Sequence, residues 1–194
     1  KVLRPGAGDR TTLARFEAER HVLAMMSHPS VAHVFDAGAL PDGRPYFVME
    51  HVDGLPITTY CDRHRLDIEA RLALFLDLCD GVQSAHQRGI IHRDLKPSNV
   101  LVTEQLGRPQ PKIIDFGLAK ALHAQPLDAP MVTEAGRVLG TPGFMSPEQA
   151  LGNQADVDTR SDVFALGVIL YLVLTGEMPW RSEGKESTAT PQRP

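Results

Sequence analysis

The chain contains the stretch His92-Arg93-Asp94-Leu95-Lys96-Pro97-Ser98-Asn99, which is followed by Asp115-Phe116-Gly117. Asp94 and Asn99 are close in sequence, so a short loop can direct both side chains into one cleft. Asp115 comes directly after the apolar residues 113–114, which are typical of a strand, and Gly117 allows the chain to turn at once. Carboxylate and amide oxygens are the ligands that magnesium prefers. The spacing therefore predicts a magnesium site at Asn99 and Asp115, with Asp94 beside it.

The same residues suit the transfer of a phosphoryl group. That reaction needs little covalent chemistry from the protein and depends on positioning and charge neutralisation. A carboxylate must orient the attacking hydroxyl and accept its proton, and Asp94 stands where such a base would stand. Magnesium at Asn99 and Asp115 could bridge the phosphates of a nucleotide. The loop therefore indicates a phosphoryl-transfer enzyme.

A third motif, G-T-P-G-F-M-S-P-E at residues 140–148, follows the first two. With it, the sequence from Lys1 to about Trp180 resembles the eukaryotic-type (Hanks-type) serine/threonine protein kinases, and is most similar to their bacterial members. The resemblance implies an α+β, two-lobed protein-kinase-like fold that uses ATP and Mg²⁺. The catalytic residues that it implies are Asp94 as the base, Lys96 on the γ-phosphate, and Asn99 and Asp115 on magnesium.

The resemblance also implies where the nucleotide binds. Lys1 fits the last letter of the family's V-A-I-K strand motif, and Glu19, on a helix expected over 11–26, fits the glutamate that pairs with that lysine. A solvated terminal lysine and an ordinary surface glutamate are the alternatives. Residues 50–54 resemble the hinge whose backbone grips adenine. The adenine-site residues implied in this way are Met49 behind the pocket, Glu50, His51 and Val52 in the hinge, and Leu101 under the ring.

Parts of the family's pattern have no counterpart in the chain. There is no G-x-G-x-x-G loop, and no arginine corresponds to the usual partner of Glu148. Residues 181–194 are polar, so we expect that tail to be disordered. We therefore expect a partial kinase domain over 1–180, whose parts are a truncated small β lobe over 1–50, a hinge over 51–54, and a mainly helical large lobe over 55–180 that lacks its last helices.

Two further residues gain structural roles from the resemblance. His92 is expected to pack with Phe116, and with the positions of Leu23 and Val34, in a stack that is intact in the active state. Asp162 resembles the aspartate that holds the backbone of the 92–99 loop from below. We therefore interpret both His92 and Asp162 as structural.

A regulatory role is expected for Arg93, because a guanidinium beside Asp94 can pair with a phosphate on the segment between the second and third motifs. Thr133 is the preferred phosphorylation site, with an ordinary solvated loop threonine as the alternative. Thr141 is expected instead to hydrogen-bond Asp94 and Lys96.

Periodicity predicts the remaining elements. Strands are expected over 31–35 and 46–50 around a turn at 40–43, and a β-hairpin from 100–102 and 112–114. The apolar run 163–174 is too short to span a bilayer and predicts a buried helix. A long helix is expected over 67–88, stopped by Gly89, with a buried face made of Leu72, Phe75, Leu76, Cys79 and Val82.

Composition narrows the class of protein further. With 194 residues, 42% of them hydrophobic and 23% charged, the chain can form a globular core. A net charge of -4 with dispersed Lys and Arg argues against nucleic acid as a partner. Cys61 and Cys79 lack C-x-x-C spacing and the histidines lack a zinc pattern. We therefore expect reduced thiols, no membrane segment in this chain and a cytoplasmic location.

The favoured function is a protein serine/threonine kinase that transfers the γ-phosphate of ATP to Ser or Thr hydroxyls of protein substrates, because Lys96 and the 140–148 motif are typical of that class. A catalytically inactive nucleotide-binding scaffold is one alternative, although Lys1, Asp94 and Asp115 are all present. A small-molecule phosphotransferase is another. Homodimerisation for autophosphorylation stays open, and the sequence identifies no substrate.

Overall fold

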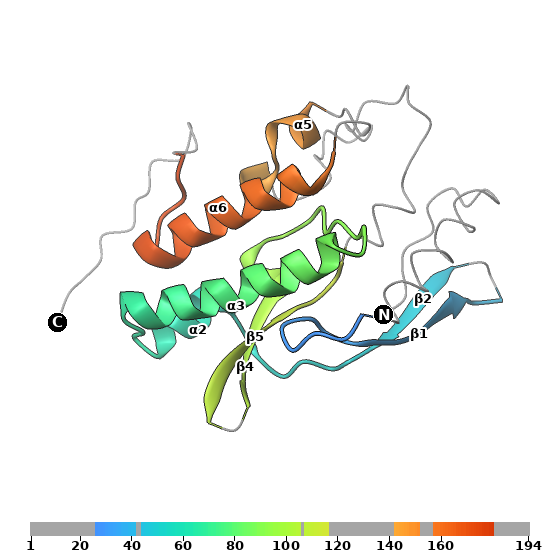
Figure 1. The fold of residues 1–194 in the computed structure, drawn as a ribbon, viewed down its shortest axis with the longest axis horizontal. Helices are drawn as coiled ribbons and strands as arrows, with labels where there is room; N and C mark the ends of the chain where they lie inside the picture. Colours follow the sequence, from blue (N-terminus) through green and yellow to red (C-terminus); the bar gives the residue numbers. More distant parts are fainter. Residues whose placement is uncertain (1–25, 42–43, 106, 117–141, 152–156, 181–194) are drawn as a thin grey trace.

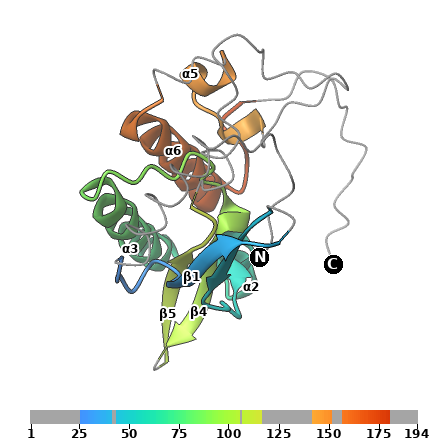
Figure 2. The same cartoon turned by 90° about the vertical axis from the view of Figure 1, so that its right-hand side faces the viewer.

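The computed structural model describes residues 26–41, 44–105, 107–116, 142–151 and 157–180. A two-stranded sheet, β1 (Val34–Ala39) and β2 (Pro45–Met49), lies beside a three-stranded sheet of β3 (Leu55–Pro56), β4 (Val100–Gln105) and β5 (Arg108–Ile113) (Figure 1). The helices are α2 (Ile57–Arg63), α3 (Ile68–His86), α5 (Pro147–Ala150) and α6 (Thr159–Thr175), with short 3-10 helices η1 (Pro97–Asn99) and η2 (Pro142–Phe144). Helices α3 and α6 lie side by side, and α5 lies on the far side of α6 from β4 and β5 (Figure 2).

Strand β1 begins later than the sequence predicts. Val31 forms a parallel bridge with Ile113, and the Ala32 N–H donates to the Ile113 carbonyl at 2.9 Å. These residues therefore pair with β5 before the chain reaches β2. The strand expected over 31–35 is corrected to 34–39, whereas the strand expected over 46–50 lies within one residue of its predicted place.

Two short elements between β2 and α3 have no counterpart in the sequence predictions. Strand β3 pairs antiparallel with β4, with Leu55 opposite Val102 and Pro56 opposite Leu101. Helix α2 follows directly and buries Ile57, Tyr60 and Cys61. Elements this short contain too few residues to produce a periodic pattern, which is why the sequence did not indicate them.

The β4–β5 hairpin is longer than predicted. Its register runs from Val100 opposite Ile113 to Gln105 opposite Arg108. The outer half of β5 contains Pro109 and Pro111, which strand propensity disfavours, so only the apolar inner ends were predicted.

Helix α3 forms close to its predicted limits. The Asp67 side chain caps it by accepting a hydrogen bond from the Ala70 N–H at 2.9 Å, and Gly89, with φ of +73°, follows its end. The predicted buried face is wrong in part, because Leu72 and Leu76 are exposed while Val82 is buried. The buried residues are Leu74, Leu78, Gly81, Val82 and Ala85.

Gly81 explains why the buried face of α3 is rotated about the helix axis from the predicted one. A Cβ built there would lie 2.9 Å from Ile113 Cδ1 and 3.1 Å from Ser30 Cβ. Small residues such as Gly81 and Ala85 therefore bring α3 close to β5, and a hydrophobicity pattern does not count them as contact positions.

Helix α6 is the predicted apolar helix. Asp158 caps its start by accepting from the Arg160 N–H at 2.8 Å, and Gly176, in the left-handed conformation, ends it. It is buried on one side only, since Val163, Tyr171 and Leu174 are exposed. Within the described part of the chain, no helix has the length and apolar character needed to cross a membrane.

Arg71 links three helices. From α3, its Nη1 donates to the Val173 carbonyl in the last turn of α6 at 2.6 Å, and its Nη2 lies 2.9 Å from Asp62 Oδ1 in α2. Its Nε also donates to the Leu66 carbonyl at 2.9 Å. Beneath these contacts the helices and the β4–β5 hairpin share one core, which includes Ile57, Leu78, Val100, Ile113 and Ile169.

Candidate active site

The 92–99 loop connects α3 to β4 and ends in η1. Arg93 in this loop has φ of +64°, and Asp115, just after β5, has φ of +58°. Non-glycine residues are uncommon in this left-handed region, and strained residues cluster at functional sites where the surrounding structure holds them. The structure thus places a left-handed residue in each of the first two sequence motifs.

Asp94, Lys96 and Asn99 form one polar cluster. Lys96 Nζ lies 2.8 Å from Asp94 Oδ2. Asn99 Nδ2 donates to the Asp94 carbonyl at 2.8 Å and to Asp94 Oδ2 at 3.3 Å. The side chains of Lys96 and Asp94 are 23% and 28% exposed, so a substrate can reach them, while Asn99 is buried. An accessible carboxylate oriented by an ammonium and an amide is suited to accept a proton from a hydroxyl.

Asn99 and Asp115 are joined through the main chain. Ile114, which precedes Asp115, donates its N–H to the Asn99 carbonyl at 2.9 Å. The Asn99 side chain makes its two hydrogen bonds through the amide nitrogen, which leaves its amide oxygen for a cation. An amide oxygen and a carboxylate fit magnesium, which usually completes its shell with water and phosphate oxygens. Among the residues that the structure describes, no group of three or more His, Cys, Asp or Glu could hold a metal alone.

His92 lies beneath this cluster and is fully buried. Its Nδ1 accepts from the Asp94 N–H at 3.2 Å, so its Nε2, 3.0 Å from the Ile114 carbonyl, is the donor nitrogen. Burial lowers the pKa of His92, against the opposing influence of Asp162 and the Ile114 carbonyl, and keeps the ring neutral. The ring lies 4.8 Å from that of Phe116, centroid to centroid. His92 therefore connects both motifs without facing a substrate.

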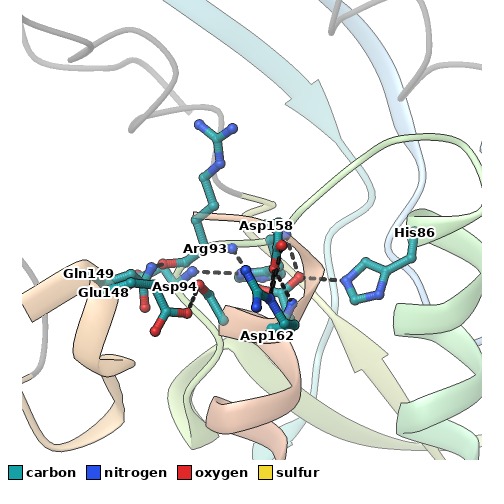
Figure 3. A network of polar contacts seen from close by, with 10 residues as sticks. His86, Arg93, Asp94, Glu148, Gln149, Asp158 and Asp162 are labelled. Carbon is teal, nitrogen blue, oxygen red and sulfur yellow. Dashed lines mark hydrogen bonds and ion pairs between the residues drawn. The ribbon is translucent and has the colours of Figure 1, made fainter. Parts of the chain in front are cut away.

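Asp162 of α6 holds the backbone of the 92–99 loop (Figure 3). Its Oδ2 accepts from the His92 N–H and its Oδ1 from the Arg93 N–H, both at 2.8 Å. His86 Nε2, at the end of α3, also lies 2.8 Å from Asp162 Oδ2. The sequence does not indicate this contact of His86, because all that it shows for His86 is a position at the end of a helix. A buried carboxylate with three donors fixes the backbone of the loop.

Helix α5 supports the same loop. Gln149 Nε2 donates to the Arg93 carbonyl at 2.8 Å, and Gln149 forms a capping box with Ser146. In the structure Ser161 Oγ donates to Glu148 Oε1 at 2.5 Å. The hydrogen bond from Ser161 lowers the pKa of the Glu148 carboxyl. Neither Gln149 nor Ser161 was singled out from sequence.

The expected adenine residues lie on β2, on β4 and on the segment that follows β2. Met49 ends β2, His51 and Val52 follow in the segment without regular structure before β3, and Leu101 lies in β4. Glu50 is fixed by its N–H, which donates to the His33 carbonyl at 2.8 Å, and by its carboxylate, which lies 3.0 Å from Lys112 Nζ. The sequence does not indicate this role of Lys112 either.

Several predictions fall on residues outside the described ranges. These are the helix over 11–26, the pair Lys1 and Glu19, Leu23 of the stack, and the regulatory threonines Thr133 and Thr141. The polar tail over 181–194 also lies outside them.

Comparison with known proteins agrees with this geometry. The family model described as the protein kinase domain matches residues 1–193. This chain belongs to the protein kinase domain family. Its fold is accordingly the two-lobed α+β kinase fold, and kinase domains as a family use ATP and Mg²⁺.

The kinase domain has relatives among bacterial serine/threonine kinases. It is 42% identical over 171 residues to the serine/threonine-protein kinase Pkn1 of Myxococcus xanthus, covering 88% of this chain and 24% of Pkn1. The crystal structure of the Mycobacterium tuberculosis PknI kinase domain (C20A_R136A double mutant) matches with a TM-score of 0.67 and 30% identity, covering 93% of this chain and 65% of that one. A structure of Rad53 in complex with AMP-PNP matches with a TM-score of 0.66 and 26% identity, covering 88% of this chain and 40% of Rad53. The chain thus spans about a quarter of Pkn1.

Proposed function

We propose that the protein transfers the γ-phosphoryl group of ATP to serine or threonine hydroxyls of proteins. The observation that carries this proposal is the cluster of Asp94, Lys96 and Asn99, joined to Asp115 by the hydrogen bond from the Ile114 N–H to the Asn99 carbonyl. It gathers a base, a cation and two oxygen ligands at one partly exposed place. These are the parts that phosphoryl transfer requires.

Each residue of the cluster has a distinct task in this proposal. Asp94 orients the acceptor hydroxyl and takes its proton, and the ammonium of Lys96 neutralises charge on the γ-phosphate. The Asn99 and Asp115 oxygens would hold magnesium, which supplies charge neutralisation at the phosphates when bound. The N–H groups held by Asp162 keep the loop that carries Asp94 in one conformation.

The nucleotide would lie against the segment between β2 and β3. The backbone of Glu50, His51 and Val52 would receive the adenine, with Met49 behind it and Leu101 beneath it. Lys1 and Glu19 would form the ion pair that holds the α- and β-phosphates. The likeness to Rad53, whose structure is a complex with AMP-PNP, supports nucleotide binding by this chain.

The acceptor class follows from Lys96 and from the relatives. Pkn1 and pkn3 of Myxococcus xanthus, both named serine/threonine-protein kinases, are 42% and 39% identical to this chain. Regulation would act through Arg93, by pairing with a phosphate on Thr133, and through a Thr141 hydrogen bond to Asp94 and Lys96. ATP as substrate places the activity in the cytoplasm, with proteins rather than nucleic acid as partners. Two copies could meet for autophosphorylation.

The test is transfer of radiolabelled phosphate from ATP to dephosphorylated casein in the presence of magnesium. Asp94→Asn removes the base, so turnover should fall by about a hundredfold or more. Asp77→Asn, an exposed aspartate on α3, is the control and should leave turnover unchanged.

Three results would contradict the proposal. Undiminished turnover of Asp94→Asn would show that Asp94 is not the base. Nucleotide binding without any transfer by the parent protein would instead favour the inactive scaffold, and transfer to a small alcohol alone would favour a small-molecule phosphotransferase.

A further inference from the structure

Residues 30–32 are attached to β5 by a set of hydrogen bonds, which we call the seam. The Ile113 N–H donates to the Ser30 carbonyl at 2.8 Å, and the Ala32 N–H donates to the Ile113 carbonyl at 2.9 Å. Gln110 Nε2 donates to Ser30 Oγ at 3.0 Å. The residues that lead into β1 are therefore fixed on β5 through both main-chain and side-chain bonds.

Beside the seam, β5 carries a buried lysine. Lys112 is 8% exposed, and its Nζ lies 3.0 Å from Glu50 Oε1 and 3.1 Å from Oε2. Glu50 Oε2 also accepts from the His33 N–H at 3.1 Å, while the Glu50 N–H donates to the His33 carbonyl. The main chain and the carboxylate of Glu50 are thus held by two elements, β5 and the residues just before β1.

The Glu50 carboxylate is ionised at neutral pH in this setting. Burial by itself raises the pKa of Glu50, but the His33 N–H and the Lys112 ammonium together outweigh burial and lower it. A buried lysine is costly unless it is paired. Such pairs contribute little net stability compared with apolar residues of the same size, and their better-attested role is to specify one arrangement of the chain.

The segment that Glu50 begins is held at its other end as well. A Cβ built on Gly54 would lie 2.7 Å from the Val102 carbonyl oxygen and 3.0 Å from Thr103 Cγ2. Gly54 therefore rests directly on β4. Residues 51–54 have no regular secondary structure of their own, so the β4–β5 hairpin fixes both ends of this segment, through Val102 at one and Lys112 at the other.

We propose that Lys112 is a positioning residue for the nucleotide: by holding the Glu50 carboxylate, it sets the direction of the backbone at residues 50–52 that receives the adenine. This inference rests on the proposed function. It predicts that the Lys112–Glu50 pair controls nucleotide affinity without taking part in the transfer step. The loop that carries Asp94 is held separately, by bonds that join η1 to Asp94 and join α5 and α6 to Arg93.

The variants that test it are Lys112→Met, Glu50→Gln, their combination, and Lys112→Arg, which keeps the charge. Arg108→Met, on the exposed end of β5, is the matched control. Binding of a fluorescent ATP analogue gives Kd, and phosphate transfer to casein gives KM for ATP and kcat. Thermal denaturation monitors folding, and Glu50→Gln, which keeps an acceptor for the His33 N–H, tests the pair if Lys112→Met does not fold.

The single neutral variants should weaken nucleotide binding and raise KM about tenfold, since small misplacements of a binding group cost factors of this size. The double variant should be no worse than either single one, because the two residues act as a pair. Lys112→Arg and the control should bind as the parent does, and kcat should stay within about twofold.

Unchanged Kd in both neutral variants, or a fall in kcat with KM unaltered, would overturn the role of Lys112. Failure of the parent protein to bind the nucleotide would instead contradict the proposed function itself.

Discussion

At the scale of single residues, Asp162 is the group on which most of the site depends. Its carboxylate accepts the N–H groups of His92 and Arg93 and contacts His86. Asp162→Ala would leave two buried donors unsatisfied, at roughly 1–3 kcal/mol each. We expect the free energy of unfolding in urea to fall by about 3 kcal/mol. We also expect turnover at saturating ATP to be lost, because Asp94 directly follows the two released N–H groups.

Asp158→Ala is the matched control for this change. Asp158 lies on the same helix and caps its exposed start. Asp158→Ala should lower the free energy of unfolding less than Asp162→Ala does, and it should leave turnover intact. If both variants lost the same stability and the same activity, Asp162 would be only a helix residue and not the support of the 92–99 loop.

At the scale of elements, two leucines of α3 differ from the sequence prediction, which placed Leu76 on the buried face and did not include Leu78 in it. Leu78 is fully buried, whereas Leu76 is 66% exposed. Leu78→Ala should therefore cost about 2–5 kcal/mol of unfolding free energy in urea, as a core truncation does. Leu76→Ala should change it by about 0.5 kcal/mol or less. An equal or larger loss for Leu76→Ala would contradict the burial that the structure gives to these two leucines.

Some features of these helices and strands could be predicted from the sequence and others could not. The long helices α3 and α6 and the inner ends of β4 and β5 were predicted, because hydrophobic patterns and stop residues such as Gly89 are local signals. The rotation of α3 was not, since it depends on how closely Gly81 allows β5 to approach. The hydrophobic periodicity of a helix does not show which distant strand the helix contacts.

The residues of the candidate active site also divide into those that the sequence predicts and those that it does not. Motifs identified Asp94, Lys96 and Asn99, which form one cluster in the structure, and Asp115, which follows the residue hydrogen-bonded to Asn99. The supporting residues act on partners far away in the sequence, so no motif spacing could indicate them. They include His86, Lys112 and Gln149, which lie 76, 62 and 56 positions from their partners.

At the scale of the whole molecule, the buried His92 makes stability depend on pH. The folded-state pKa of His92 is lowered below its ordinary value of 6.5, so below that pH the unfolded chain binds a proton that the folded chain does not. The contribution is present above pH 6.5 and is lost as the pH falls toward the folded-state pKa. One such proton changes the unfolding free energy by up to about 1.4 kcal/mol per pH unit.

The measurement is urea unfolding between pH 7.5 and about pH 5, compared with His92→Phe. The variant should be less stable throughout but should lose stability less steeply below pH 6.5, because the other histidines remain in both proteins. Parallel slopes would indicate that the pKa of His92 is the same in the folded and the unfolded chain.

The seam between residues 30–32 and β5 also bears on how the chain reaches its fold. Gln110 and Ser30 are 80 residues apart, whereas β4 and β5 are joined by a tight turn. Closing a long loop costs conformational entropy before any contact rewards it, so local pairs form more readily than distant ones. The hairpin can assemble early, and its β5 edge is then the template that residues 30–32 join later. The segment proposed to receive the nucleotide depends on the same strand through Lys112, so we expect it to form after the hairpin.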